Sequence, residues 1–366
     1  MARVFISMSG EGRGHATRVR AVTEGLRAEH EVCLFAPGDA YELLAPIYAG
    51  SDVRVEPIAG LRFHYRGRRV DYPRTGREAL RYLLTLPRLI RHLEQRIRAE
   101  RPDLVITDFE PALPRAAKRA GTRLVSLDHQ HFLLTYDLSS LPRRLRWHAA
   151  YMAAVVRLYC SGQSETIVSS FYFPPLRPEA HHVTQVGVLL RPEVVAASPV
   201  TGDHVVSYWR RFAPENVLQA LRECGREVRL YGLGERPQDG NLVFRPIGAD
   251  GFLSDLAGSA ALVCTAGNQL VGEALHLGKP VLAAPEPGNY EQYINAHFLG
   301  LSGAGEWTEM AALTGEKLRG FLGRLDEHRQ RIPRDRMDGL PEALRMLRRQ
   351  LARHRASLPS PGLQPA

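Results

Sequence analysis

CTAGNQLVGEALHLGKPVLAAPEPGNYEQYINA, residues 264–296, contains one local pattern twice. An apolar strand pattern ends at Cys264, a turn of small residues follows, and a helical pattern begins near Gly267. The run KPVLAAP then predicts a second strand, and a second helix is predicted to begin near Tyr290. Strands that alternate with helices of this length are typical of a parallel α/β sheet.

The same alternation runs along most of the 366-residue chain. Strands are predicted over ARVFISMS, EVCLFAP, PDLVITD and RLVSLDH in the first half, and over HVVSYWR, EVRLYGLG and NLVFRPI in the second. We therefore expect an α/β fold of two Rossmann-like parallel-sheet domains that face each other across a cleft. The N-terminal domain is predicted at 1–187, the C-terminal domain with a terminal helix at 188–356, and a tail at 357–366. Ligands of such sheets bind beyond the carboxyl ends of the strands, where each strand turns into a helix.

Composition excludes several classes of protein. Hydrophobic residues make up 44% of the chain and the formal net charge is +9. No apolar run reaches the ~20 residues that span a bilayer, and no signal-peptide pattern is found. The four cysteines have neither metal nor disulfide spacing, which indicates reduced, buried thiols in a cytoplasmic protein. Nucleic acid is not expected as a partner, because no base-stacking or helix-turn-helix pattern occurs.

The positive charge is concentrated in residues 62–98, where eleven arginines stand against three acidic residues. Leucines alternate with arginines in REALRYLLTLPRLIRHLEQRIRAE, residues 77–100. This pattern predicts attraction to an anionic membrane surface or a phosphorylated lipid, on the inner face of the membrane. A solvated helix face that packs normally on its other side is the alternative interpretation.

The two helices of the opening stretch carry the candidate ligand groups. Free N–H groups at the start of the first helix favour phosphate, and Gly267 leaves room for a close approach. Glu273 lies at the edge of the apolar arc, where its carboxylate can accept both hydroxyls of a ribose. On the second helix Glu291, Gln292 and Asn295 share one arc, which suits a polyhydroxyl ligand. Ordinary solvated helix surfaces are the alternative for both.

These segments resemble the nucleotide-sugar-binding region of glycosyltransferases with the GT-B fold, especially glycosyltransferase family 28. That group includes the lipid-linked N-acetylglucosaminyltransferase and the diacylglycerol glycosyltransferases. The resemblance covers roughly residues 1–310 and is most specific over 247–300, through GADGFLSDLAGSAALVCTAG, LVGEALHLGKPVLAAP and GNYEQYINAHFLGLSGAG. It implies a nucleotide-sugar donor in the second domain and an acceptor in the first. It also implies no metal and no cofactor, since the nucleotide-sugar is a co-substrate.

The resemblance also implies which residues bind the donor. They are Phe252 and Leu253 around the nucleobase, Glu273 on the ribose, Gly267 and Asn268 on the diphosphate with Thr265 in the same turn, Glu291 and Gln292 on the sugar, and Ser207. One departure is visible at residues 205–216, VVSYWRRFAPEN, where the family often has a glycine- and serine-rich phosphate loop. This chain keeps Ser207 but has no glycine there. We expect Arg210 or Arg211 to compensate for the charge of the diphosphate.

A second glycine-rich segment, SGEGRGHATR, occupies residues 9–18. Its glycines are spaced too tightly for the dinucleotide fingerprint, and Glu11 would repel a pyrophosphate, so NAD and FAD are not expected. Glycosyltransferases of the resembled fold frequently place Gly-His at this helix start, with the histidine close to the acceptor hydroxyl. The acceptor-binding residues that we expect are Gly12, Arg13, Gly14 and His129.

The chemistry of sugar transfer explains a histidine at this position. An inverting transfer requires removal of the acceptor's proton as its oxygen attacks, and imidazole titrates near neutrality. We therefore expect His15 to be the catalytic base, with Asp108, or secondly Asp128, fixing its tautomer. A buried structural histidine is the alternative, because His15 shares a helical arc with Val19. The segment DHQHF, residues 128–132, lacks the spacing of a zinc site.

The sequence thus predicts an inverting, metal-independent transferase. It would move a hexosyl group from a nucleotide-sugar, most simply UDP-linked, to a hydroxyl of a lipid or small-molecule acceptor. Two alternatives stay open. A nucleotide-sugar 2-epimerase would use the same donor pocket and needs several carboxylates, which Asp108, Glu110 and Glu291 could supply. A nonenzymatic nucleotide-sugar-binding protein needs no catalytic group.

Overall fold

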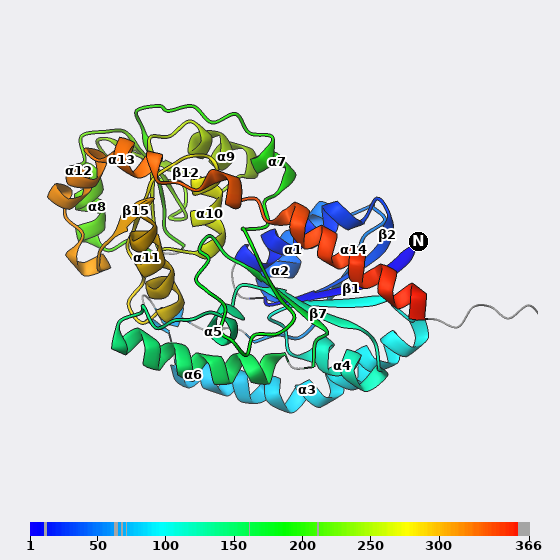
Figure 1. The fold of residues 1–366 in the computed structure, drawn as a ribbon. Helices are drawn as coiled ribbons and strands as arrows, with labels where there is room; N and C mark the ends of the chain where they lie inside the picture. Colours follow the sequence, from blue (N-terminus) through cyan, green and yellow to red (C-terminus); the bar gives the residue numbers. More distant parts are fainter. Residues whose placement is uncertain are drawn as a thin grey trace, which may run out of the picture.

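The computed structural model describes residues 1–10, 13–61, 65–66, 69–70, 72–160, 162–210 and 212–357. Two parallel β-sheets organise these residues, one in each half of the chain (Figure 1). A separate antiparallel pair, β4 (Tyr65–Arg66) and β5 (Arg69–Val70), accompanies them. The predicted α/β architecture of two parallel-sheet domains is confirmed.

The first sheet has seven strands in the order β3-β2-β1-β6-β7-β8-β9. Its strands are β1 (Ala2–Met8), β2 (His30–Ala36), β3 (Arg54–Pro57), β6 (Leu104–Asp108), β7 (Leu124–Asp128), β8 (Glu165–Ser169) and β9 (Val183–Val186). The helices of this half are α1 (Arg13–Leu26), α2 (Gly38–Tyr48), α3 (Tyr72–Glu100), α4 (Ala112–Ala120), α5 (Phe132–Thr135) and α6 (Arg143–Tyr159).

The second sheet has six strands in the order β12-β11-β10-β13-β14-β15. Its strands are β10 (Val205–Tyr208), β11 (Val228–Tyr231), β12 (Leu242–Arg245), β13 (Ala261–Cys264), β14 (Val281–Ala283) and β15 (Gly305–Trp307). The helical segments are α7 (Pro192–Val195), α8 (Glu215–Arg222), α9 (Ala249–Ala257), α10 (Asn268–His276), α11 (Tyr290–Ser302), η1 (Met310–Ala312), α12 (Gly315–Leu322), α13 (Leu325–Gln330), η2 (Arg334–Arg336) and α14 (Leu340–Ser357).

The central strands explain why the site lies at one edge of each sheet. Every residue of β6, β7 and β8 is buried, as expected for parallel strands covered by helices on both faces. The register pairs Met8 with Asp108, so β1 and β6 end side by side. Asp128 likewise pairs with Val168 at the end of β7 and β8. The polar residues that follow these strands are therefore gathered at the same carboxyl edge.

The terminal helix, predicted as the end of the second domain's residue range, packs on the first domain. Helix α14, red in Figure 1, packs against the first domain beside α1. Its residues Leu344, Leu347 and Leu351 belong to the same hydrophobic cluster as β1 and α1, and Arg348 pairs with Glu29 at 2.7 Å. The apolar face of α14 completes the core of the first domain, a partner that the local sequence of the helix does not reveal.

The chain consequently passes between the domains twice, and the two crossings lie together. Val188 and Asp338 form a parallel bridge, and the Gly339 N–H donates to the Val188 carbonyl at 2.9 Å. A Cβ atom on Gly339 would lie 2.1 Å from the Gly187 carbonyl oxygen. Only glycines allow the backbones to approach this closely.

The two domains also share buried surface. One hydrophobic cluster combines Phe132 and Tyr172 of the first domain with Val271 and Ile294 of the second. All four cysteines are free and buried. Within the described ranges, no helix has both the length and the apolar character needed to cross a bilayer.

Candidate active site

The expected catalytic pair lies at the carboxyl edge of the first sheet. His15 is in the first turn of α1, and Asp108 is the last residue of the neighbouring strand β6. The Nδ1 atom of His15 lies 2.9 Å from Oδ1 of Asp108. The Asp108 side chain is fully buried, whereas 13% of the His15 side chain is exposed. The structure thus brings together the two residues that the sequence analysis paired.

A third residue of this cluster, Arg18, was missed at the level of sequence. Its Nε and Nη2 atoms each donate to a different oxygen of Asp108, both at 2.9 Å. Nη2 also lies 3.2 Å from Nδ1 of His15. Arg18 is 3% exposed although it belongs to a helix next to solvent. The signal that could have revealed it is its position one turn after His15, on the same side of α1.

The residue after Asp108, Phe109, has an aromatic ring that is nearly parallel to the imidazole ring of His15. Phe109 has a φ of +54°, a left-handed conformation that is uncommon for a residue with a bulky side chain. Its ring stacks on Tyr159 of α6, with centroids 4.5 Å apart, and is stacked toward His15 at 6.4 Å. Strained backbone of this kind persists where the surrounding packing holds it, which is common at functional sites.

The other two acidic candidates near β6 and β7 are already occupied. The Asp128 carboxylate bonds to Nδ1 of His131 at 2.7 Å rather than to His15. Burial opposes ionisation of Asp128, but His131 and Ser126 outweigh it and lower the pKa to about 2. The Glu110 carboxylate accepts the N–H groups of Ala112 and Leu113 at the start of α4. Glu110 thus caps the start of α4, and burial raises its pKa.

In the second domain, the turn before α10 has the shape expected of an anion site. Gly267 is the N-cap of α10, and a Cβ atom built on it would meet nothing within 4 Å. Ala266 before it has a φ of +67°. Its carbonyl accepts a hydrogen bond from Asn295 Nδ2 at 3.0 Å, which fixes the turn. Thr265, 6% exposed, completes it. The N–H groups of the first helical turn have no partner within the helix, and the space beside Gly267 is open.

Glu273 lies one turn further along α10 and is 4% exposed. Its carboxylate accepts from Gln269 Nε2 at 3.0 Å and pairs with Arg191 Nη2 at 3.2 Å. Arg191 stands just before α7, beyond the first crossing between the domains. Glu273 is therefore held in place by two donors, one from its own helix and one from the connection.

The start of α11 approaches the catalytic pair from the second domain. Gln130, after β7, donates to the Glu291 carboxylate at 3.4 Å, and the charge of Glu291 acts on Arg18 and His129. Gln292 turns the other way, because its amide bonds to the backbone N–H and carboxylate of Glu286. Of the two residues expected on the donor sugar, Glu291 faces His15's side of the molecule.

A cavity of about 290 Å³ lies at the carboxyl ends of β11 and β12. The residues that line it are Tyr231, Arg245, Pro246, Ile247, Gly248, Gly251, Ser254 and Asp255. Phe252 and Leu253, expected around the nucleobase, are partly buried and pack against the core. Phe252 packs edge to face on Tyr231, with centroids 4.9 Å apart. The cavity is thus formed by their sequence neighbours, because the helical turn directs residues 252 and 253 inward.

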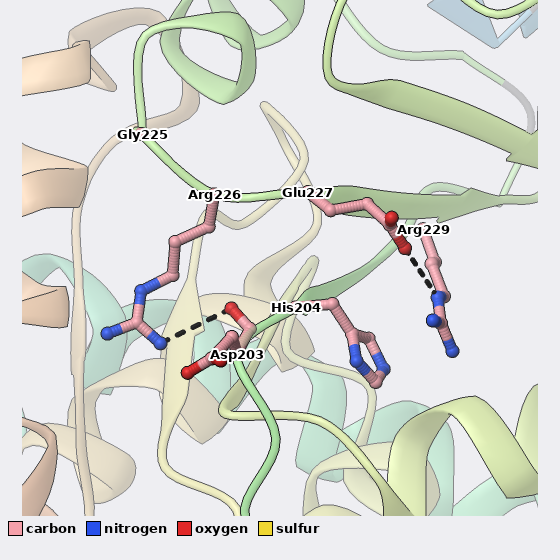
Figure 2. A pocket seen from close by; sticks show the side chains of 6 residues that line it. All are labelled: Asp203, His204, Gly225, Arg226, Glu227 and Arg229. Atoms are coloured by element: carbon pink, nitrogen blue, oxygen red, sulfur yellow. Dashed lines mark hydrogen bonds and ion pairs between the residues drawn. The ribbon is translucent and has the colours of Figure 1, made fainter.

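A second cavity, of about 420 Å³, lies at the opposite edge of the same sheet. Figure 2 shows its lining residues, which include Asp203, His204 and Arg226, at the amino ends of β10 and β11. Arg226 bonds to the Asp203 carbonyl, and Arg229 pairs with Glu227. Ligands of parallel sheets bind at the carboxyl ends, so this cavity is distinct from the candidate site.

Residues 2–326 match the family described as Glycosyl transferase family 1. The chain belongs to this family. It is a glycosyltransferase of the GT-B fold, as the resemblance implied. The model that matches is described as family 1, and the finer resemblance to family 28 stays a prediction.

Solved structures similar to this glycosyltransferase show the same fold. The calicheamicin glycosyltransferase CalG4 has a TM-score of 0.66 at 18% identity, covering 96% of this chain and 99% of its own. Arabidopsis thaliana UGT89C1 in complex with UDP has a TM-score of 0.67 at 14% identity, covering 97% and 100%. MurG of Acinetobacter baumannii has a TM-score of 0.61 at 16% identity, covering 95% and 100%. No curated protein matches the chain in sequence.

Three of the residues expected to bind ligands make hydrogen bonds within the protein. His129, expected at the acceptor, is 1% exposed and contacts the Ser169 carbonyl and Asn295 Oδ1. The Asn268 side chain bonds to the backbone of Ser169 and Phe171, so only its backbone N–H stays at the helix start. Ser207 is fully buried within β10 and accepts from Trp209 Nε1 at 2.7 Å. Polar residues after a strand can face the other domain as readily as a ligand.

The remaining acceptor candidates lie at the start of α1. Arg13 and Gly14 are exposed there, and Gly14 has open space around its Cα. Burial raises the pKa of Tyr208 at the end of β10, and the charge of Arg13 opposes this rise. The charge of Arg13 thus acts on a residue of the second domain. Gly12 lies outside the described residues, as do Glu11 and Arg211.

His129 makes the interface between the domains sensitive to acid. Burial lowers the pKa of His129, and burial likewise lowers the pKa of His276 and His297. An unfolded histidine takes up a proton near pH 6.5, whereas these buried ones resist it, so stability falls as the pH drops below about 6.5. We expect His129→Gln to reduce this loss between about pH 7.5 and pH 5.5, measured by urea unfolding. The exposed control His181→Gln should leave it unchanged; equal losses in His129→Gln and wild type would contradict the prediction.

Proposed function

We propose that this glycosyltransferase moves a hexosyl group from a UDP-linked sugar to an acceptor hydroxyl. The displacement inverts the anomeric centre, needs no metal ion, and uses His15 as the base. The observation that carries the proposal is the 2.9 Å contact between His15 Nδ1 and Asp108 Oδ1, with Glu291 of the donor-side helix near the same cluster. Neighbouring structures contain UDP, as in the UGT89C1 and LpCGTa complexes, which supports this donor.

The proposed reaction follows from the groups at the two sheet edges. His15 donates its Nδ1 hydrogen to Asp108, so Nε2 accepts the proton of the acceptor hydroxyl. The acceptor oxygen bonds to the anomeric carbon as the bond from that carbon to the UDP oxygen breaks on the opposite face. UDP leaves with the bonding electrons, and its charge is stabilised by the N–H groups at the start of α10. Glu291 accepts hydrogen bonds from the sugar hydroxyls.

The deciding experiment is incubation with UDP-glucose, UDP-galactose and UDP-N-acetylglucosamine, with a membrane lipid extract or small hydroxyl compounds as acceptor and with EDTA present. A glycoside of inverted configuration, identified by mass and NMR, is the expected product. Formation of a 2-epimer without acceptor would identify an epimerase instead. Thermal shifts with nucleotides and sugar nucleotides report the donor site separately, and absence of any stabilisation would overturn it.

We further propose that the acceptor is membrane-bound and that the enzyme binds the inner membrane surface peripherally. Among the side chains that the structure describes, nine large hydrophobic ones are more than half exposed, and six of these lie on α3 and α6. They are Leu80, Leu83 and Leu84 on α3, and Trp147, Tyr151 and Leu158 on α6. Helix α6 carries four arginines and no acidic residue, and both helices run along the lower rim in Figure 1. Apolar side chains between arginines suit an anionic bilayer.

The membrane proposal predicts a specific loss of binding. A variant with Trp147, Tyr151 and Leu158 all changed to alanine should bind vesicles of phosphatidylcholine and phosphatidylglycerol more than about tenfold more weakly, because three large apolar contacts are lost. Raising the salt from about 50 mM to about 500 mM should weaken wild-type binding too. Val200→Ala with Leu301→Ala is the control, since both residues are exposed elsewhere. Co-sedimentation measures the binding. Equal binding of both variants, or no binding by the wild type, would reject the proposal.

A further inference from the structure

Arg18 is the charged group of the catalytic cluster that the proposed reaction does not use. Its guanidinium is almost completely removed from solvent, which is costly unless its donors are satisfied. Two of them bond to the two oxygens of Asp108 in a fork geometry, each at 2.9 Å. Lysine cannot reproduce such a two-point contact. The orientation of the Asp108 carboxylate is therefore set from α1, the same helix that carries His15.

The contact with His15 decides which ring nitrogen carries the hydrogen. Nδ1 lies 2.9 Å from Asp108 Oδ1 and 3.2 Å from Arg18 Nη2. A guanidinium has no acceptor atom, so an Nδ1 hydrogen can be donated only to the carboxylate. A lone pair on Nδ1 would instead face Oδ1 of Asp108 at 2.9 Å, and two acceptor atoms at that distance repel each other. The arrangement favours hydrogen on Nδ1 and a lone pair on Nε2.

The same geometry places a permanent positive charge beside the ring. Protonation of His15 would put a second cation next to Arg18, with Asp108 between them shared by both. Other charged groups also face the cluster: Asp128 from the end of β7 and Glu291 from α11 act on Arg18, and Arg13 precedes His15 on α1. Among them, Arg18 is the cation in direct contact with the imidazole.

We propose that Arg18 is a positioning residue for the base. It holds Asp108 so that the hydrogen of His15 stays on Nδ1 and Nε2 is free to take a proton from the acceptor, and it places a cation directly beside the ring. The inference rests on the proposed role of His15. If this role is correct, removal of the cation and removal of the anion should shift the titration of His15 in opposite directions. A purely structural salt bridge would not predict such opposite shifts.

NMR titration of the His15 ring in the full-length protein tests the inference. The signal is assigned by its loss in His15→Gln. In Arg18→Met, the midpoint of the titration should rise by about one to two pH units, because the repelling charge is gone and Asp108 remains. In Asp108→Asn it should fall, because only the repelling charge remains. Arg18→Lys should lie closer to wild type. Arg20→Met, on the same helix and paired with Glu193, should leave the midpoint unchanged.

Outcomes of this titration separate the inference from the proposed function, since neither donor nor acceptor is added. A folded Arg18→Met protein with an unchanged or lower midpoint overturns the role of Arg18, even if the enzyme transfers sugar. If the midpoints shift as expected but the protein transfers no sugar, only the proposed function is overturned. Should Arg18→Met not fold, Arg18→Gln, which keeps donors without the charge, takes its place with the same expected rise. With a known acceptor, the acid limb of the kcat/KM profile should move with the NMR midpoint in Arg18→Lys.

Discussion

His15→Ala should lower kcat for sugar transfer by about 10²–10⁴-fold, the usual contribution of a positioned general base. The alanine variant keeps the α10 start, Glu273 and Glu291, which lie on other elements, so its affinity for UDP should stay near that of the wild type. Steady-state kinetics with the best donor, and UDP binding by calorimetry, measure the two quantities. The loss should fall on kcat because the acceptor oxygen gains nucleophilicity only as its proton leaves.

The matched control is His181→Ala, which removes an exposed histidine far from the catalytic cluster in sequence. It should retain wild-type kcat. Asp108→Asn should show a loss in the same direction as His15→Ala, because the tautomer of the ring is no longer fixed. Full transfer activity in His15→Ala would reduce this residue to part of the helix packing and would leave the reaction without its proposed base.

Gly339→Ala should lower the free energy of unfolding by about 3 kcal/mol, the upper part of the range for overpacking. A Cβ atom there would lie 2.1 Å from the Gly187 carbonyl oxygen and 2.6 Å from the carbonyl carbon. Both atoms belong to the backbone, so no side chain can rotate away. The crossing segments would have to separate, which would weaken the hydrogen bond from Gly339 to Val188. Urea unfolding of the full chain measures the change.

Gly76→Ala is the control for this substitution. Gly76 lies within helix α3, and a Cβ atom there meets nothing within 4 Å. Alanine is the better helix former, so this variant should be as stable as the wild type or slightly more stable. The reciprocal change Gly187→Ala should be about as harmful as Gly339→Ala, since its Cβ would meet the Arg336 carbonyl at 2.3 Å. A Gly339→Ala protein with the wild-type unfolding midpoint would show that the two crossings can move apart freely.

Much of the fold could be predicted because each strand and helix carries its own local pattern. The strand predicted over PDLVITD became β6, and the small-residue turn before residue 268 became the start of α10. His15 and Asp108 could be paired because strand order places the ends of neighbouring parallel strands together. These predictions depend on periodicity and topology, which the sequence displays directly.

Contacts between distant segments could not be predicted from the local patterns. The apolar stripe of α14 shows that the helix packs on something, but not that its partner is the first domain. His129 and Asn268 follow strands in the way that ligand-binding residues do, and their partners across the interface are invisible locally. Arg18 was not among the predicted site residues. Its burial depends on a carboxylate 90 residues away.

The paired crossings at Val188 and Asp338 have a mechanical consequence. Two bodies joined at well-separated points can hardly rotate against each other, whereas two connections at one point form a single pivot. The bridge between Val188 and Asp338 places both connections between the domains at one such point. A chain cut before Asp338 would therefore lose both this second connection and the apolar face of α14 that completes the core of the first domain.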